Sequence, residues 1–189
     1  MKKFLAMLMA VMMVLSLVTV PVMAETPAAN DPRLSTAPKT GNAAAPADAA
    51  NLNEALNVAG GTLTFTSEGD HPWIVDGDAA KSTNVNVANS TSTVSTTVTA
   101  AAGDILQFDF MSFGEGSGNY VWDGLHLTVD GTEVMKWSRV ETWTTYAVEL
   151  TAGEHTITWT YQKDSTVDKE GDYANVDNCL LYTSDAADD

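Results

Sequence analysis

Apolar and polar side chains alternate along most of the stretch 51–178, and this alternation limits the fold more than any other feature of the chain. In the segment 155–161, for example, a large side chain at every second position alternates with threonine. A period of two places successive side chains on opposite faces of a strand, and β-branched partners favour half-buried antiparallel strands. Many such short strands predict an all-β fold, an antiparallel two-sheet β-sandwich of the jelly-roll type.

The same alternation predicts which side chains face the core and where the chain turns. Asp130-Gly131 is typical of a hairpin turn. Gln107 and Asp109 are expected on the polar face of their strand. His155 is expected to be a hydrogen-bonded core or turn histidine, and 51–57 to form at most one short helical turn. The predicted inward-facing residues include Phe65, Val94, Val98, Leu106, Phe108, Phe110, Leu125, Leu127, Ile157, Trp159 and Tyr161.

The N-terminal segment predicts export from the cell. Lys2 and Lys3 precede an apolar run, and small residues end at Ala24. This is the pattern of a secretory signal peptide, so residues 1–24 are expected to be removed. A retained membrane anchor is the alternative. We expect a secreted or cell-surface protein that is not inserted in the membrane once the signal is cleaved.

The segment 25–50 is rich in alanine and proline and nearly free of large apolar side chains. Such a composition cannot bury enough surface to offset chain entropy, so a disordered linker is expected. The stretch 51–178 then has the size of one domain.

The C-terminal residues Cys179–Asp189 resemble the translation of a transposase-type sequencing adapter. We therefore expect a non-native tail at 179–189, with a genuine acidic tail as the alternative. In that case the single cysteine of the chain is not native. The module would also be truncated within its last strand, which Leu180 and Leu181 of the tail would complete.

The chain is strongly acidic, with 25 Asp and Glu against nine Lys and Arg. Such a surface repels phosphate backbones and anionic lipid, so nucleic-acid binding is not expected.

Several runs resemble one group of surface modules. LNEALN at 52–57, AGDILQFDF at 102–110, AGEHTITWTYQKD at 152–164 and GDYANVDN at 171–178 are similar to modules of large surface proteins from gut Clostridia. The wider relatives are jelly rolls of the choice-of-anchor, cleaved-adhesin and MAM-like kind. The resemblance implies a jelly-roll fold at the cell surface and says little about function.

Calcium is the cofactor that the acidic loops favour, because this ion binds several carboxylate and carbonyl oxygens. In related jelly rolls a structural calcium joins an early loop to the last strand. The resemblance therefore implies Asp172 and Asp177 as metal ligands, with Asp76 or Asp78. The alternative is a solvated acidic loop.

The sequence predicts no enzyme. Its three histidines lack a second His or Cys at zinc-ligand spacing, and no nucleophile elbow or phosphate loop is present. The glycine-rich run 114–118 is expected to be a flexible loop.

Tyr120 and Trp122 lie beside that glycine-rich run and are the candidates for an exposed ligand-binding platform. The alternative is that these rings fill the end of the sandwich. We expect a non-catalytic module for extracellular attachment or recognition of a glycan or protein. A passive spacer in a larger surface protein is the alternative, and a fragment of a carbohydrate-active enzyme is a third reading.

Overall fold

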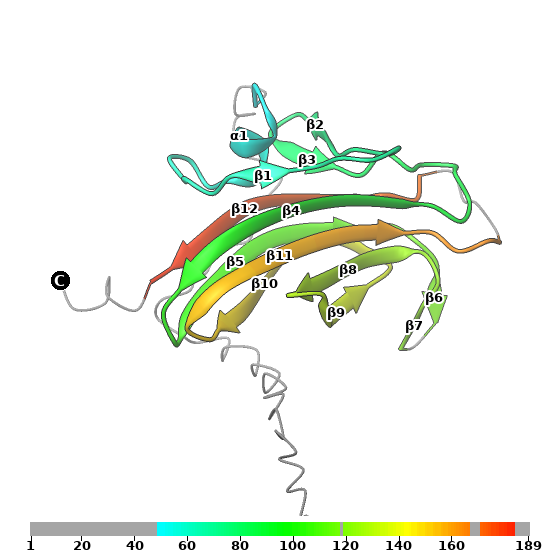
Figure 1. Cartoon of the computed structure of the whole chain (residues 1–189). Helices are drawn as coiled ribbons and strands as arrows, with labels where there is room; N and C mark the ends of the chain where they lie inside the picture. Colours follow the sequence, from blue (N-terminus) through cyan, green and yellow to red (C-terminus); the bar gives the residue numbers. More distant parts are fainter. Residues whose placement is uncertain (1–48, 118, 167–170, 184–189) are drawn as a thin grey trace, which may run out of the picture.

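The computed structural model describes residues 49–117, 119–166 and 171–183. In this part of the chain two five-stranded sheets pack face to face, and a small hairpin extends from one end (Figure 1). The predicted signal peptide, most of the predicted linker and residues 184–189 lie outside the described residues. None of the helices in the described ranges is both long and apolar enough to cross a membrane.

The two sheets confirm the predicted antiparallel β-sandwich. All strand pairs within both sheets are antiparallel. In order across the first sheet the strands are β1 (Phe65–Thr66), β4 (Thr91–Ala100), β11 (Gly153–Gln162), β8 (Gly124–Val129) and β9 (Thr132–Trp137). In order across the second they are β10 (Val140–Leu150), β5 (Asp104–Ser112), β12 (Ala174–Tyr182), β3 (Ala79–Lys81) and β2 (Ile74–Asp76).

The core lies between the sheets and is built from the predicted alternation. Val94 and Val98 of β4 face inward, as do Phe108 of β5 and Trp159 of β11. The rings of Phe108 and Trp159 meet edge to face with their centroids 5.3 Å apart, a favoured aromatic geometry. This contact joins the centres of the two sheets.

The predicted turn at Asp130-Gly131 joins β8 to β9. Both residues have positive φ, 52° and 76°, as a two-residue type I′ hairpin turn requires. The turn places Val129 opposite Thr132, and an irregularity between Leu127 and Thr128 then places Leu127 of β8 opposite Met135 of β9.

The outer face of β5 departs from the half-buried pattern, because Gln107 and Asp109 are buried as well. Thr145 of β10 donates a hydrogen bond to Asp109 Oδ1 at 2.5 Å, and the Asn178 amide donates to Oδ2 at 2.9 Å. Side chains from both neighbouring strands therefore lie against this carboxylate. Alternation in a single segment could not reveal them.

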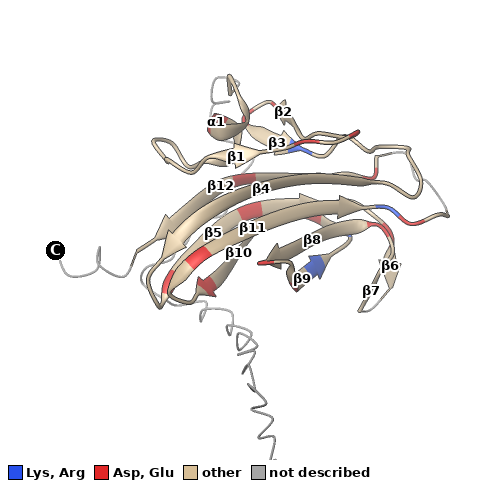
Figure 2. Ribbon diagram, in the orientation of Figure 1, with Lys and Arg blue, Asp and Glu red and all other residues tan. Residues whose placement is uncertain are grey.

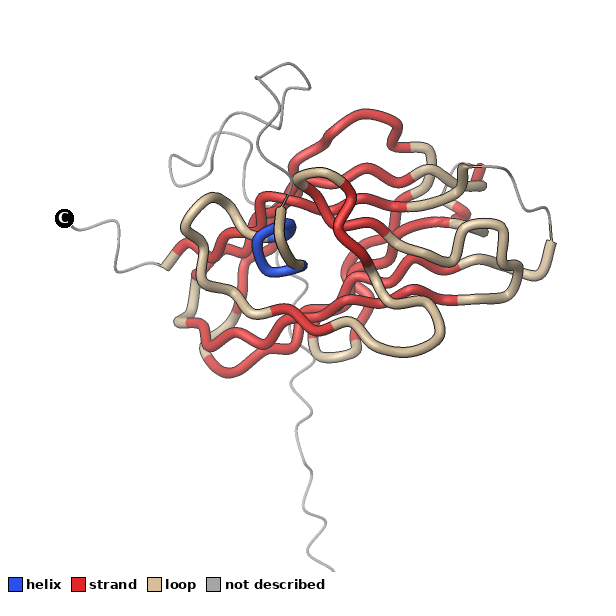
Figure 3. Tube along the Cα trace, turned by 90° about the horizontal axis from the view of Figure 1, so that it is seen from above, coloured by secondary structure: helices blue, strands red, loops and turns tan. Residues whose placement is uncertain are grey.

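The short helix α1 (Leu52–Leu56) confirms the predicted helical turn. Asn51 caps it by accepting a hydrogen bond from Glu54 N at 3.1 Å. The helix contacts β1 of one sheet and β2, β3 and β12 of the other, and its Ala55 and Leu56 are buried. Seen from above, it lies among the strands of the fold (Figure 3), in contact with both sheets.

Strand β12 continues into the segment that resembles an adapter. Asn178 has a φ of 53° at an irregularity in the pairing with β5, after which Leu180 pairs with Gln107. Cys179 enters the core, and burial raises the pKa of its thiol. Leu180 and Leu181 lie in β12 as expected, and the non-native origin of 179–189 stays a prediction.

Candidate functional site

The predicted aromatic platform lies on the small hairpin at the end of the sandwich. Its strands are β6 (Gly116–Ser117) and β7 (Tyr120–Val121), which lie beyond β8 and β9 (Figure 1). Tyr120 is 73% exposed and Trp122, just after β7, is 42% exposed. Trp73 and Trp159, by contrast, are buried. The structure therefore presents this pair of rings to solvent.

The base of the hairpin is held by backbone hydrogen bonds. Glu115 N donates to Asp123 O at 3.1 Å, and Glu115 O accepts from the amides of Trp122 and Asp123 at 2.9 and 3.0 Å. A Cβ added to Gly116 would lie 2.2 Å from Ser138 Oγ, so the hairpin packs closely on the chain between β9 and β10. The glycine-rich run was expected to be a flexible loop, but these contacts make its described part a packed hairpin.

A buried group of three charged side chains lies at the base of the hairpin, where Asp123 hydrogen-bonds to Glu115. Lys163 Nζ is 3.5 Å from Asp123 Oδ2 and 3.4 Å from Asp172 Oδ2. The lysine side chain is 0% exposed, and the aspartates are 1% and 6% exposed. In Figure 2 basic and acidic residues follow one another just after β11. We call Lys163, Asp123 and Asp172 the end cluster.

Burial dominates the electrostatics of the end cluster. It raises the pKa of Asp123, while the amide of Asp164 and the charge of Lys163 act in the opposite direction. Burial also raises the pKa of Tyr161, and the charges of Asp172 and Asp123 add to that rise. The Tyr161 hydroxyl donates a hydrogen bond to Phe113 O. The phenol therefore stays neutral beside the cluster.

The four predicted calcium ligands lie in different surroundings. Asp172 belongs to the end cluster, and Asp177 lies on β12 opposite Asp109. Asp76 Oδ2 on β2 is 3.5 Å from Lys81 Nζ, and Asp78 lies in the turn after β2. Within residues 49–117, 119–166 and 171–183, no group of three or more His, Cys, Asp or Glu side chains is arranged to hold a metal ion. Calcium binding stays a prediction.

His155 lies at the other end of β11. It contacts an aspartate and a threonine hydroxyl, the kinds of group that surround the histidine of a catalytic triad. Its Nδ1 is 2.7 Å from Asp130 Oδ2, and its Nε2 is 3.3 Å from Thr151 Oγ1 and 2.9 Å from Thr151 O. Burial lowers the pKa of His155, but the hydrogen bond to Asp130 outweighs burial and raises it. An imidazolium donates from both nitrogens and is no general base. The predicted hydrogen-bonded histidine is confirmed, and the geometry gives it a structural role.

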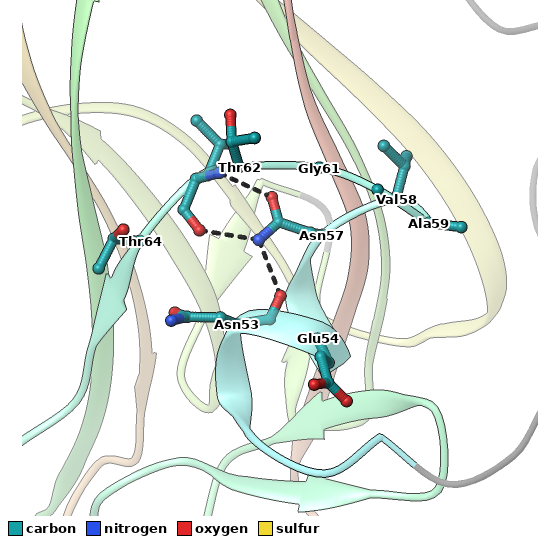
Figure 4. A pocket seen from close by; sticks show the side chains of 10 residues that line it. Asn53, Glu54, Asn57, Val58, Ala59, Gly61, Thr62 and Thr64 are labelled. Atoms are coloured by element: carbon teal, nitrogen blue, oxygen red, sulfur yellow. Dashed lines mark hydrogen bonds between the residues drawn. The ribbon is translucent and has the colours of Figure 1, made fainter.

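Two hollows are lined by residues outside the hairpin. One of about 330 Å³ adjoins α1, and there the Asn57 side chain donates to Asn53 O and Leu63 O and accepts from Leu63 N (Figure 4). Asn57 therefore fixes the loop. The second, of about 360 Å³, is lined by segments 68–71 and 87–91 with Thr93.

No protein-family model and no curated protein matches the chain. Among solved structures, the chain is similar to the secreted serine protease VesC from Vibrio cholerae, with a TM-score of 0.51, 17% identity and coverage of 62% of this chain. The match spans only 24% of VesC. At this identity the likeness shows a shared fold.

Two carbohydrate-binding modules are also similar in structure. A mutant of the family 29 module CBM29-2 has a TM-score of 0.44 and 15% identity, over 69% of this chain and 89% of that one. A family 35 module from Clostridium thermocellum has a TM-score of 0.41 and 16% identity, over 63% of this chain and 92% of that one.

Sequence reasoning found the exposed rings but missed the end cluster. One signal was present: Lys163 continues the inward positions 155, 157, 159 and 161 of β11. A lysine in such a position needs a buried anionic partner. Nothing in the sequence indicates which of the many aspartates supplies it.

Proposed function

We propose that this chain is a non-catalytic recognition module that binds a neutral glycan through Tyr120 and Trp122. The exposure of the two rings, 73% and 42%, on a hairpin with a fixed base carries the proposal. Aromatic faces provide a large apolar contact with a polar edge, which suits a sugar ring. Exposed aromatic side chains at a protruding surface are typical of binding sites.

Charge favours a neutral ligand. The chain has a net charge of −16, and Glu115 and Asp164 lie close to the base of the hairpin. Carboxylated or sulfated glycans would be repelled by such a surface. Stacking on the rings and hydrogen bonds to sugar hydroxyls would therefore supply the affinity.

The test is binding of the full mature protein to an array of neutral and anionic oligosaccharides, followed by calorimetry on those that bind. Trp122→Ala and Tyr120→Ala should each weaken binding by about tenfold or more, the effect of losing an aromatic anchor. Trp122→Phe should restore part of the affinity. Ile74→Ala removes an exposed apolar side chain from β2 and serves as the matched control.

Two outcomes would contradict the proposal. The absence of binding to any glycan would favour the passive spacer. Binding that survives both alanine substitutions but is lost on changing the hollow near His71 would move recognition to that side of the module.

A further inference from the structure

Lys163 combines complete burial with two carboxyl neighbours. Lys81, Lys136, Arg139 and Lys163 are the basic residues of the described ranges other than histidine, and only Lys163 is buried. Its position is fixed by the backbone, because Lys163 N donates to Ser90 O at 2.9 Å. Its side chain is 0% exposed, so the amine lies in a site from which water is excluded.

The carboxyl group of Asp123 is held next to the Lys163 amine by a hydrogen bond from the backbone. Asp164, the residue after the lysine, donates its backbone N–H to Asp123 Oδ1 at 2.8 Å. The other oxygen, Oδ2, is buried without a hydrogen bond and is 3.5 Å from Lys163 Nζ. The amine nitrogen thus lies next to a carboxyl group whose outer oxygen no hydrogen bond restrains.

Burial favours the neutral forms of the two groups that would react. A buried ammonium and a buried carboxylate can exchange one proton and become a neutral amine and a carboxylic acid. Burial raises the pKa of Asp123 and so favours the acid form at that position. A carboxylic acid beside a buried amine is the reactant pair for amide formation.

The three side chains of the end cluster are shielded from water. Lys163 is 0% exposed and the aspartates are 1% and 6% exposed, and the buried phenol of Tyr161 is close enough for the charges of both aspartates to act on it. Exclusion of water removes the solvent that would hydrate the amine and the acid. It also protects an amide, once formed, from hydrolysis.

We propose that Lys163 and Asp123 condense to an intramolecular amide, with Asp172 as the proton relay. The Lys163 ammonium gives one proton to the Asp123 carboxylate, and the resulting neutral amine attacks Cγ of the Asp123 carboxyl group. Asp172 takes a proton from the attacking nitrogen and returns it to the departing hydroxyl of Asp123. One N–C bond forms, one C–O bond breaks and one water leaves, so the reaction needs no oxidant or added reagent.

The amide would join the end of β11 to the start of β8 at the base of the aromatic hairpin. It would fasten two segments that are far apart in the sequence. The cross-link does not depend on glycan recognition, since a module that serves only as a spacer would carry it equally well.

The intact mass of the purified, folded mature protein tests the proposal. The mass should be lower than that of the unmodified chain by one water molecule. Tryptic digestion should leave the chain uncut after Lys163, because trypsin does not cleave after an acylated lysine, and tandem spectra should link the peptides of Lys163 and Asp123. Lys81 Nζ is also 3.5 Å from a carboxylate, that of Asp76, but these side chains are 27% and 50% exposed, so cleavage after Lys81 is the internal control.

Three variants sharpen the test. Lys163→Arg keeps the charge and should show the full unmodified mass. Asp172→Asn keeps both reacting groups and should slow the mass loss at least tenfold. Asp123→Asn should lose ammonia in place of water, and its cross-linked form should have the same mass as the cross-linked wild type, since both reactions leave the same amide.

An unmodified mass for wild-type protein that unfolds cooperatively would overturn the proposal without any variant. A link that maps to Asp172 would also overturn it, because Asp123 would then not be the acceptor. The variants are checked for cooperative unfolding in the same way, so a misfolded variant is not counted as a failed reaction.

Discussion

The two ends of the inward face of β11 carry the same kind of contact in opposite surroundings. At the first end His155 pairs with Asp130, whose side chain is 49% exposed. At the other end Lys163, 0% exposed, faces Asp123 and Asp172. Water screens the first pair, so its groups can titrate. The contact of Lys163 with the two aspartates is shielded from water, so there the charges must be compensated within the protein. The exposure of an ion pair to water therefore decides how strongly its charges affect the stability of the fold.

Removal of the buried ammonium should have the largest effect. Without the amide, Lys163→Ala leaves Asp123 and Asp172 buried with no cation, which should lower the free energy of unfolding by about 3–5 kcal/mol. With the amide, the variant loses the cross-link as well. Urea denaturation at neutral pH measures the loss.

Lys163→Arg separates charge from covalent linkage in that experiment. Arginine retains the charge, so it should cost less than alanine. If the amide is present, the arginine variant still loses the cross-link. The chain-entropy relation used for disulfides places that loss at about 4 kcal/mol for a loop of this size. Equal stability of wild type and Lys163→Arg would contradict a contribution from the cross-link and would agree with a contribution from charge alone.

A methyl group added at Gly114 should lower stability by a steric clash next to the end cluster. The added Cβ would lie 2.2 Å from Asp123 O and 2.9 Å from Tyr161 Oη. A backbone carbonyl gives way poorly, so Gly114→Ala should cost about 1–3 kcal/mol. Thermal unfolding followed by tryptophan fluorescence measures the change. Ser117→Ala, on the exposed part of the hairpin, should leave the midpoint unchanged.

The His155–Asp130 pair should make a smaller contribution to stability, and one that depends on pH. His155 has a raised pKa, so its contribution to stability is complete below its ordinary value of 6.5 and is lost as the pH rises through the raised value. Burial raises the pKa of Asp130, but the hydrogen bonds from His155 and Thr156 N outweigh it and lower the value. Its contribution is complete above 3.8 and lost as the pH falls through the lowered value.

The pair should therefore stabilise the fold most near pH 5. As the pH rises above 6.5 and through the raised pKa of His155, the contribution of the pair, about 0.5–1 kcal/mol after solvent screening, should disappear. His155→Gln and Asp130→Asn should each flatten this part of the stability profile. A profile that keeps the wild-type slope in both variants would show that other groups produce it.

The smallest effect is expected for a pair that is exposed on both sides. Lys136 Nζ is 3.1 Å from Glu133 Oε1, closer than Lys163 is to either aspartate, yet both side chains are exposed by 40% or more. Lys136→Ala should change the free energy of unfolding by at most about 0.5 kcal/mol in the same urea titration. A loss comparable to that of Lys163→Ala would mean that distance and not burial sets the energy of these pairs.

Sequence reasoning was correct where the signal is local. The alternation from His155 to Tyr161 predicted the inward face of β11, and the Asp130-Gly131 turn predicted the hairpin between β8 and β9. It was incomplete for Asp109, whose outer-face burial depends on Thr145 and Asn178 from two other strands. The exposed positions of Tyr120 and Trp122 were anticipated, but the contacts that fix their hairpin were not.

The sequence by itself determined that this chain forms strands and pairs them into a two-layer sandwich, because a period of two leaves each strand with one apolar face to bury. Only the tertiary structure decided that Lys163 meets Asp123 and Asp172. The three residues come from different segments and are brought together by non-local strand pairing. Alternation assigns a face to a side chain, but the register of other strands and the depth of burial determine its partners and its charge.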